Sequence, residues 1–216
     1  MNIVIERFNK IKSNILLTDP KRPVNIIAVS KTFGIDHIKP LIDINHIHFG
    51  ENKVQEADFK WNVIRKTNPI IKLHMIGRLQ SNKAKKAIQL FDYVHSLDNQ
   101  KLADTLAKNE KLLNKKLKYF IQVNIGSELQ KSGLSYGEVD QFYTYCTKEL
   151  NMNIVGLMAI PPNDQSTNKY FDSISQLNFS LNLPELSLGM SNDYMSALKY
   201  KSTFLRIGSG IFGDRY

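Results

Sequence analysis

The sequence has little of what marks secreted, disulfide-bonded or membrane proteins. A single cysteine, Cys146, excludes an intramolecular disulfide. No stretch approaches 18 consecutive apolar residues, so we expect no membrane-spanning helix. The N-terminal segment carries Glu6 and lacks the long apolar centre of a signal peptide. Together these features predict a soluble, cytoplasmic protein.

Arginine is also scarce. The chain has a net charge of +9, but only six of its 29 basic residues are arginine. Base readout and bidentate phosphate contacts favour arginine over lysine. The densest lysine clusters fall in predicted surface helices, and no known nucleic-acid-binding motif occurs. We therefore expect no nucleic-acid partner, and a basic nucleic-acid-binding module is kept as an alternative function to be tested.

Short apolar runs alternate with amphipathic segments along the whole chain. Apolar residues at helical spacing predict a helix at 2–17, and eight short runs after it are typical of buried strands. Helix-length segments separate successive runs, which favours parallel strands. The predicted strands are 24–31, 46–52, 70–77, 92–97, 117–126, 152–160, 185–190 and 203–210.

Eight strand–helix units in 216 residues predict an α/β fold, a single (β/α)8 TIM-like barrel with an extra N-terminal helix. A doubly wound open sheet is the competing architecture, but it should carry G-x-G-x-x-G after an early strand. The chain has "SKTFG" and "GENK" at those places. No shift in composition and no linker divides the chain, so residues 1–216 are taken as one domain.

Lysine 31 closes an otherwise apolar run, "NIIAVSKTFG". Side chains alternate along a strand, so Ile27, Val29 and Lys31 are expected on one face, with Lys31 in the mouth of the barrel. A lysine at a strand end often reaches out to solvent instead. A desolvated lysine, in contrast, has a neutral, nucleophilic amine that forms a Schiff base with an aldehyde.

Two polar loops follow the last two predicted strands. "RIGSGIFG" places Gly208 and Gly210 where backbone N–H groups can approach an anion, and "GMSND" places Ser191 before a short helix. An ordinary turn and a helix cap would explain the same residues. In barrels, however, the phosphate site often lies after strands seven and eight. The two loops therefore favour a phosphate site, and Lys31 beside it suggests pyridoxal phosphate.

Histidines give a second possible chemistry. His46 and His48 form an H-x-H pair on the second predicted strand, and His74 and His95 lie near later strand ends. Barrel hydrolases use such histidines to bind zinc. Here the pair precedes the strand end and lacks surrounding acidic ligands, so we expect no metal. We expect Cys146, which lies on an apolar helix stripe, to be a buried core thiol.

Seven motifs occur in order along the chain: "AVSKT", "FGEN", "HMIGRLQSNK", "QKSG", "GLMAIPP", "LSLGMSND" and "RIGSGIFG". From about Val24 to Gly213 the sequence resembles the pyridoxal phosphate homeostasis protein family. The resemblance implies a single barrel that binds pyridoxal 5′-phosphate (PLP) and is similar to the N-terminal domain of alanine racemase.

The resemblance also implies residue roles. Lys31 would form the Schiff base with PLP, and Arg206 would face the pyridine nitrogen. The residues that would hold the phosphate are Ser191, Gly208 and Ser209.

Three further positions come from the same resemblance. Asn52 in "GEN" and Met190 in "GMS" would lie near the cofactor ring. Lys131 in "QKSG" matches a family lysine proposed as a secondary or relay site for the cofactor.

These roles favour a non-catalytic carrier or buffer that maintains intracellular PLP, with apo PLP-dependent enzymes as candidate recipients of the cofactor. A guanidinium keeps its proton, so Arg206 would leave the pyridine nitrogen unprotonated and the ring a poor electron sink. A small racemase-like enzyme is the alternative. It would need a second base, which alanine racemase takes from a tyrosine of an additional domain. The sequence has no room for that domain, so Tyr194 or Tyr216 would have to serve as the base.

The chain also departs from the pattern of its relatives. Phe33 stands where many bacterial members have a second lysine, and the sequence ends at "GDRY" where relatives often carry lysines. Transfer routes that use those lysines are not expected here. The absence of an extra domain favours a monomer.

Overall fold

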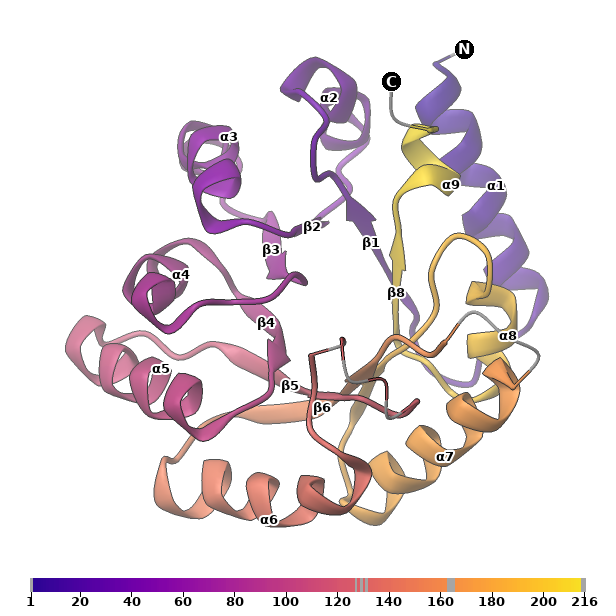
Figure 1. Cartoon of the computed structure of the whole chain (residues 1–216). Helices are drawn as coiled ribbons and strands as arrows, with labels where there is room; N and C mark the ends of the chain where they lie inside the picture. The colour runs from indigo at the N-terminus through magenta and orange to yellow at the C-terminus, as the bar shows by residue number, and fades with distance from the viewer. Residues whose placement is uncertain (1, 127, 129, 131, 163–165, 215–216) are drawn as a thin grey trace.

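Eight parallel strands close into a barrel in chain order, β1 to β8, and helices surround it (Figure 1). The computed structural model describes residues 2–126, 128, 130, 132–162 and 166–214. The strands are β1 Asn25–Val29, β2 His48–Glu51, β3 Lys72–Met75, β4 Tyr93–Leu97, β5 Lys118–Val123, β6 Ile154–Ala159, β7 Glu185–Ser187 and β8 Phe204–Ile207. The predicted barrel is confirmed, and each strand lies within a predicted apolar run.

Helices connect the strands in the predicted order. They are α1 Ile3–Leu17, α2 Ile35–Asp43, α3 Val54–Thr67, α4 Ala84–Leu90, α5 Gln100–Leu113, α6 Val139–Thr144, α7 Thr167–Ser180, α8 Tyr194–Lys199 and α9 Ser209–Phe212. Short 3₁₀ turns at Ser81–Lys83 and Tyr136–Glu138 precede α4 and α6, and a π turn at Tyr145–Glu149 follows α6. The four-residue helix α9 was not expected from the sequence.

Helix α1 confirms the predicted N-terminal helix. The side chain of Asn2 accepts a hydrogen bond from the Val4 N–H at 2.9 Å, which satisfies one of the free N–H groups at the helix start. The buried face of α1 is formed by Val4, Phe8, Ile11 and Ile15. This helix packs beside α2, α8 and α9, where the barrel closes between β8 and β1 (Figure 1).

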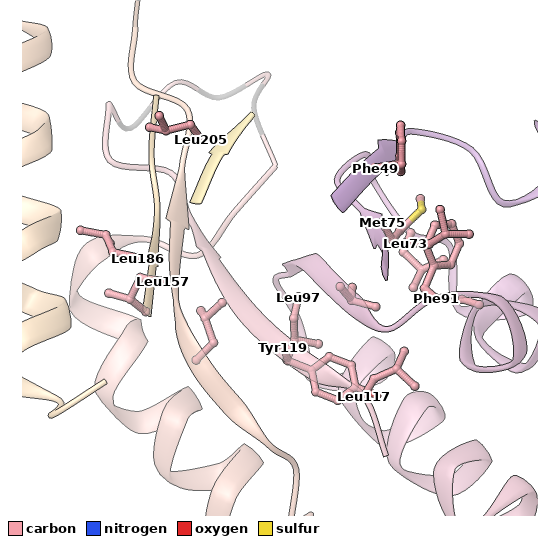
Figure 2. Close-up of a cluster of buried hydrophobic side chains, with 14 of the residues drawn as sticks. Phe49, Leu73, Met75, Phe91, Leu97, Leu117, Tyr119, Leu157, Leu186 and Leu205 are labelled. Atoms are coloured by element: carbon pink, nitrogen blue, oxygen red, sulfur yellow. The ribbon is translucent and has the colours of Figure 1, made fainter. Parts of the chain in front are cut away.

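A continuous apolar layer separates the strands from the surrounding helices. We call it the outer layer; Figure 2 shows part of it, made by outward-facing strand residues and by residues near the helices. The labelled members are Phe49, Leu73, Met75, Phe91, Leu97, Leu117, Tyr119, Leu157, Leu186 and Leu205. Cys146 belongs to this layer, and its burial raises the pKa of the thiol to about 12, which confirms a core thiol.

A second, smaller apolar cluster fills part of the barrel interior, which we call the lumen. It contains Ile27, Val29, Tyr93, Phe120, Val155, Met158 and Phe204. The predicted alternation in the first strand is thus confirmed for Ile27 and Val29. The strand ends at Val29, however, so Lys31 lies in the following turn and not in the strand.

No helix in the part of the chain that the structure describes is both long and apolar enough to cross a bilayer.

Candidate functional site

A pocket of about 340 Å³ opens beside the carboxyl ends of the neighbouring strands β1 and β8. Lys31 and Phe33 line it from the loop after β1, and Gly208 and Ser209 line it from the end of β8. Because parallel strands β1 and β8 pair, their loops emerge side by side. The structure therefore brings Lys31 together with two of the three residues predicted to hold a phosphate.

Ser191 joins this group through the backbone of the β8 loop. Its Oγ accepts a hydrogen bond from the Gly210 N–H at 3.0 Å. The loop that carries Ser191 begins at Gly189, which has φ +88° and whose carbonyl accepts the Arg206 N–H at 2.9 Å. A Cβ at position 189 would come within 2.8 Å of the Ala197 side chain, so only glycine fits this turn. The loops after β7 and β8 thus form one polar edge of the mouth.

Arg206 lies in the lumen with only 5% of its surface exposed. Its Nη1 donates to the carbonyl and the hydroxyl of Ser187, both at 2.7 Å, and its Nη2 donates to the Ala159 carbonyl at 2.9 Å. Burial lowers the pKa of the guanidinium to about 10, which leaves Arg206 charged at neutral pH. These bonds hold the group rigidly at the end of β8, as a fixed positive charge that can only donate hydrogen bonds.

The remaining predicted residues lie elsewhere. Asn52 lines a separate cavity of about 240 Å³ with Ile76 and Gly77. Met190 is 37% exposed, and its N–H donates to the Asp193 side chain. The structure therefore does not place Asn52 or Met190 in the Lys31 pocket. Lys131, the predicted secondary site, lies outside the described residues.

A buried ion pair, missed by the sequence analysis, holds the chain just before Lys31. The fully buried Glu51 accepts hydrogen bonds at its Oε1 from the Ser30 hydroxyl at 2.7 Å, from Lys60 Nζ at 2.9 Å and from Trp61 Nε1 at 2.9 Å. Lys60 Nζ also donates to the Ser30 carbonyl at 2.7 Å. The hydroxyl and the carbonyl of Ser30 are therefore both fixed by charged partners.

Glu56 holds the chain just after Lys31. Its Oε1 accepts the Thr32 N–H and a hydrogen bond from Lys60 at 3.1 Å. Partial burial raises the Glu56 pKa, but the bonds from Thr32 and Lys60 outweigh it, so the pKa lies below its usual value. Thr32 adopts φ +69°, a left-handed conformation that a threonine takes only where its surroundings enforce it. The turn that carries Lys31 is thus held at both ends.

We call Glu51, Glu56 and Lys60 the clamp. Two signals for it exist in the sequence: Glu56 and Lys60 are four residues apart on one helix, and Glu51 ends a buried strand in "FGEN". Neither signal shows that the partners meet at Ser30 and Thr32, because that contact needs the packing of α3 on β1 and β2.

The histidines of β2, β3 and β4 form a hydrogen-bonded chain in the lumen. His48 Nδ1 lies 2.9 Å from His74 Nε2, His74 Nδ1 lies 2.9 Å from His95 Nε2, and His95 Nδ1 lies 3.0 Å from Ser187 Oγ. Within the described ranges no group of three or more His, Cys, Asp or Glu residues could hold a metal ion. Both ring nitrogens of His74 thus have a hydrogen-bond partner in the lumen.

Burial keeps these histidines neutral. It lowers the pKa of His48 to about 4 and the pKa values of His74 and His95 well below 6.5. For His95 the charge of Arg206 lowers the pKa further.

Comparison with known proteins defines first the class of this barrel. The family model "Alanine racemase, N-terminal domain" matches residues 8–216. The alanine racemase of Corynebacterium glutamicum shares the fold, with a TM-score of 0.75 and 13% identity over 97% of this chain and 60% of that chain. The protein is thus an alanine-racemase-type barrel.

Sequence relatives identify the family within this class of barrel. The pyridoxal phosphate homeostasis protein of Pasteurella multocida is 34% identical over 91% of this chain and 88% of its own length, and that of Escherichia coli K12 is 33% identical over 89% and 86%. The structure of PipY from Synechococcus elongatus PCC7942 with PLP bound has a TM-score of 0.84, with 30% identity over 97% of this chain and 100% of that chain. The chain belongs to the pyridoxal phosphate homeostasis protein family.

Proposed function

We propose that this chain binds PLP in the pocket at the barrel mouth, through a Schiff base to Lys31, and maintains PLP homeostasis as a non-catalytic carrier or buffer. The observation that carries the proposal is the convergence of Lys31, Gly208 and Ser209 on one pocket. The PLP-bound PipY structure, which shares the fold over almost the whole chain, supports the choice of cofactor.

The pocket residues fit the chemistry of this cofactor. A volume of about 340 Å³ lies in the usual range for small-molecule sites. The Lys31 amine would condense with the PLP aldehyde and release water, which requires the neutral amine. The hydroxyls of Ser191 and Ser209 and the backbone at Gly208 would hold the phosphate, and the Gly210 N–H already fixes the Ser191 side chain.

Arg206 supports a role without turnover. The bound cofactor would supply a reactive aldehyde and an electron-withdrawing ring, and that ring withdraws electrons best when its nitrogen is protonated. Facing this nitrogen, the charged guanidinium of Arg206 would leave it unprotonated. The site would then hold the cofactor, with apo PLP-dependent enzymes as the acceptors, and we propose that the carrier acts as a monomer.

An absorbance spectrum tests the binding. Wild-type protein incubated with PLP should gain the visible band of a lysine imine, and borohydride reduction should fix the added mass on the peptide that contains Lys31. Lys31→Ala should lose both signals. Lys39→Ala is the matched control, because Lys39 on α2 is 61% exposed and pairs with Asp43 at the surface. A wild type without the band would overturn the proposal.

A second measurement separates the carrier from a racemase-like enzyme. Exchange of the α-proton of several amino acids in D₂O should not exceed that of free PLP. Exchange well above that rate, abolished by Lys31→Ala, would favour the enzyme. Salt-sensitive binding to arbitrary DNA or RNA that Lys31→Ala leaves unchanged would favour the nucleic-acid-binding module.

A further inference from the structure

The histidine chain spans the lumen between a groove and the cofactor end. His48 lines a groove of about 870 Å³ next to α1, at the end of the barrel where the strands begin. From there the chain passes through His74, His95 and the Ser187 hydroxyl to Arg206 Nη1, with every heavy-atom distance between 2.7 and 3.0 Å. It crosses from β2 to β8 through three other strands. We call His48, His74, His95 and Ser187 the lumen chain.

Arg206 sets the direction of the hydrogen bonds. A guanidinium has donors and no acceptor, so Ser187 Oγ must accept from it. Among the described residues, the other side-chain partner of the Ser187 hydroxyl is His95 Nδ1. If the His95 nitrogen carried the proton, the buried hydroxyl hydrogen of Ser187 would lose this acceptor, which is costly. Ser187 therefore donates to His95.

The same logic passes along the imidazoles. A neutral imidazole has one N–H and one acceptor nitrogen. His95 accepts at Nδ1, so its proton is on Nε2 and points to His74 Nδ1. His74 then carries its proton on Nε2 and donates to His48 Nδ1. All three histidines are ordered as the Nε2–H tautomer, with their donors directed away from Arg206.

Aromatic stacking fixes the orientation of two of the three imidazole rings. The His74 ring stacks on Tyr93 with centroids 4.3 Å apart, and the His95 ring stacks on Phe120 at 4.2 Å. Their burial disfavours the charged form, as the lowered pKa values indicate.

We propose that the lumen chain positions Arg206, by presenting to it an acceptor oxygen whose own hydrogen is directed away along the three histidines. The role at the pyridine nitrogen rests on the proposed function, whereas the tautomer order does not. The chain thereby keeps a buried positive charge in place for the cofactor ring. Its members are positioning residues, because they act through Arg206.

Nitrogen-15 NMR of the histidine rings tests the order in the full chain without PLP. His48, His74 and His95 should each show the Nε2–H tautomer at pH 7. Ser187→Ala removes the donor to His95 Nδ1 and should give mixed tautomers at His95 and His74. His37, which contacts the Phe212 carbonyl outside the lumen, should keep its shifts. The Nδ1–H form at His95 in the wild type would overturn the inference.

A substitution at His95 provides a second route if Ser187→Ala does not fold. His95→Gln retains an acceptor for Ser187 and a donor for His74, and should leave His74 in the Nε2–H form. His95→Phe fills the same space without either group and should give mixed tautomers at His74. Equal spectra in these two variants would also contradict the chain.

PLP titration then tests the link to the site. Ser187→Ala should weaken PLP binding about tenfold, the typical effect of losing a hydrogen bond to a charged group, while His95→Gln should stay near the wild-type value. If the histidine tautomers are ordered in the wild type but Ser187→Ala binds PLP with wild-type affinity, the positioning role is refuted. A wild type that forms no imine band would refute the proposed function and leave the tautomer result to stand by itself.

Discussion

The outer layer and the lumen of this barrel are built from opposite kinds of residue. The outer layer is almost wholly aliphatic and aromatic and surrounds the strands on their helix side (Figure 2). The lumen, only a strand's thickness away, contains three histidines, a serine and an arginine beside its small apolar cluster. Barrels of this type usually fill the lumen with layers of branched aliphatic side chains.

The two regions are stabilised by different interactions. Apolar burial stabilises in proportion to area and needs no specific partner, so the outer layer can hold the fold with many interchangeable contacts. Buried polar groups are tolerated only when each one has its partner. The lumen meets this condition with a continuous chain that ends at Arg206, close to the mouth. Each polar residue of the lumen chain therefore has a hydrogen-bond partner within the barrel.

The largest effect is expected in the outer layer. Phe91 is fully buried there, and Phe91→Ala should lower the free energy of unfolding by about 3–5 kcal/mol, the usual loss for an aromatic side chain that leaves a cavity. Urea denaturation measures this loss. Phe59→Ala on α3, where the side chain is 94% exposed, is the matched control and should change it by less than about 0.5 kcal/mol. Similar losses of unfolding free energy in the two variants would contradict a stabilising role of the outer layer.

The clamp gives the next largest effect, because it places charge within the helix side of the barrel. Glu51→Gln leaves Lys60 buried without its closest carboxylate, a change that typically costs about 3–5 kcal/mol. Glu56 still pairs with Lys60 at 3.1 Å, so the loss should fall below that range. Lys60 Nζ also donates to the Ser30 carbonyl, so a weaker hold on Lys60 should also reduce the imine band of Lys31 with PLP.

A surface ion pair is the control for the clamp. Asp58→Asn removes the partner of Lys86, and both side chains are about one-third to one-half exposed. Such pairs contribute about 0–1 kcal/mol, so stability and the imine band should stay close to the wild-type values. An unchanged imine band in Glu51→Gln would show that the clamp serves stability alone.

The sequence predicted those parts of the molecule that depend on local patterns. Alternation of apolar runs and amphipathic segments predicted the eight strands and α1. Placement of loops at strand ends predicted that Lys31 and Gly208 meet at the barrel mouth, and the family resemblance added Ser209. All three line one pocket. The end of β1 was misplaced because Ser30 and Lys31 continue its pattern, whereas the left-handed φ at Thr32 comes from contacts with α3.

The clamp and the lumen chain could not be predicted because they depend on register between strands. His74 lies opposite Gly50 of β2 and Tyr93 of β4, and only this register places it between His48 and His95. The sequence shows each histidine on its own strand but not which ones meet. For the same reason the sequence does not identify Ser187 as the partner of Arg206.

Acid should lower the free energy of unfolding gradually, by less per pH unit for each lumen histidine than either substitution costs. The unfolded histidines have pKa values near 6.5, whereas burial lowers the folded pKa of His48 to about 4. Lys72 and Lys118 lower it as well, and Asp92 opposes them. Between these values the unfolded state binds more protons, so stability is full above about pH 6.5 and declines as the pH falls towards 4.

Burial also lowers the pKa of His46, outside the lumen chain, to about 4, so the contribution of the lumen has to be isolated with a variant. Each such histidine contributes at most about 1.4 kcal/mol per pH unit, which urea midpoints at pH 7, 6 and 5 can resolve before most carboxylates titrate. His48→Gln keeps an acceptor for His74 and removes one proton site, so its slope should be shallower than that of the wild type. An unchanged slope would show that His48 takes up no proton on unfolding between pH 7 and 5 and would contradict its lowered pKa.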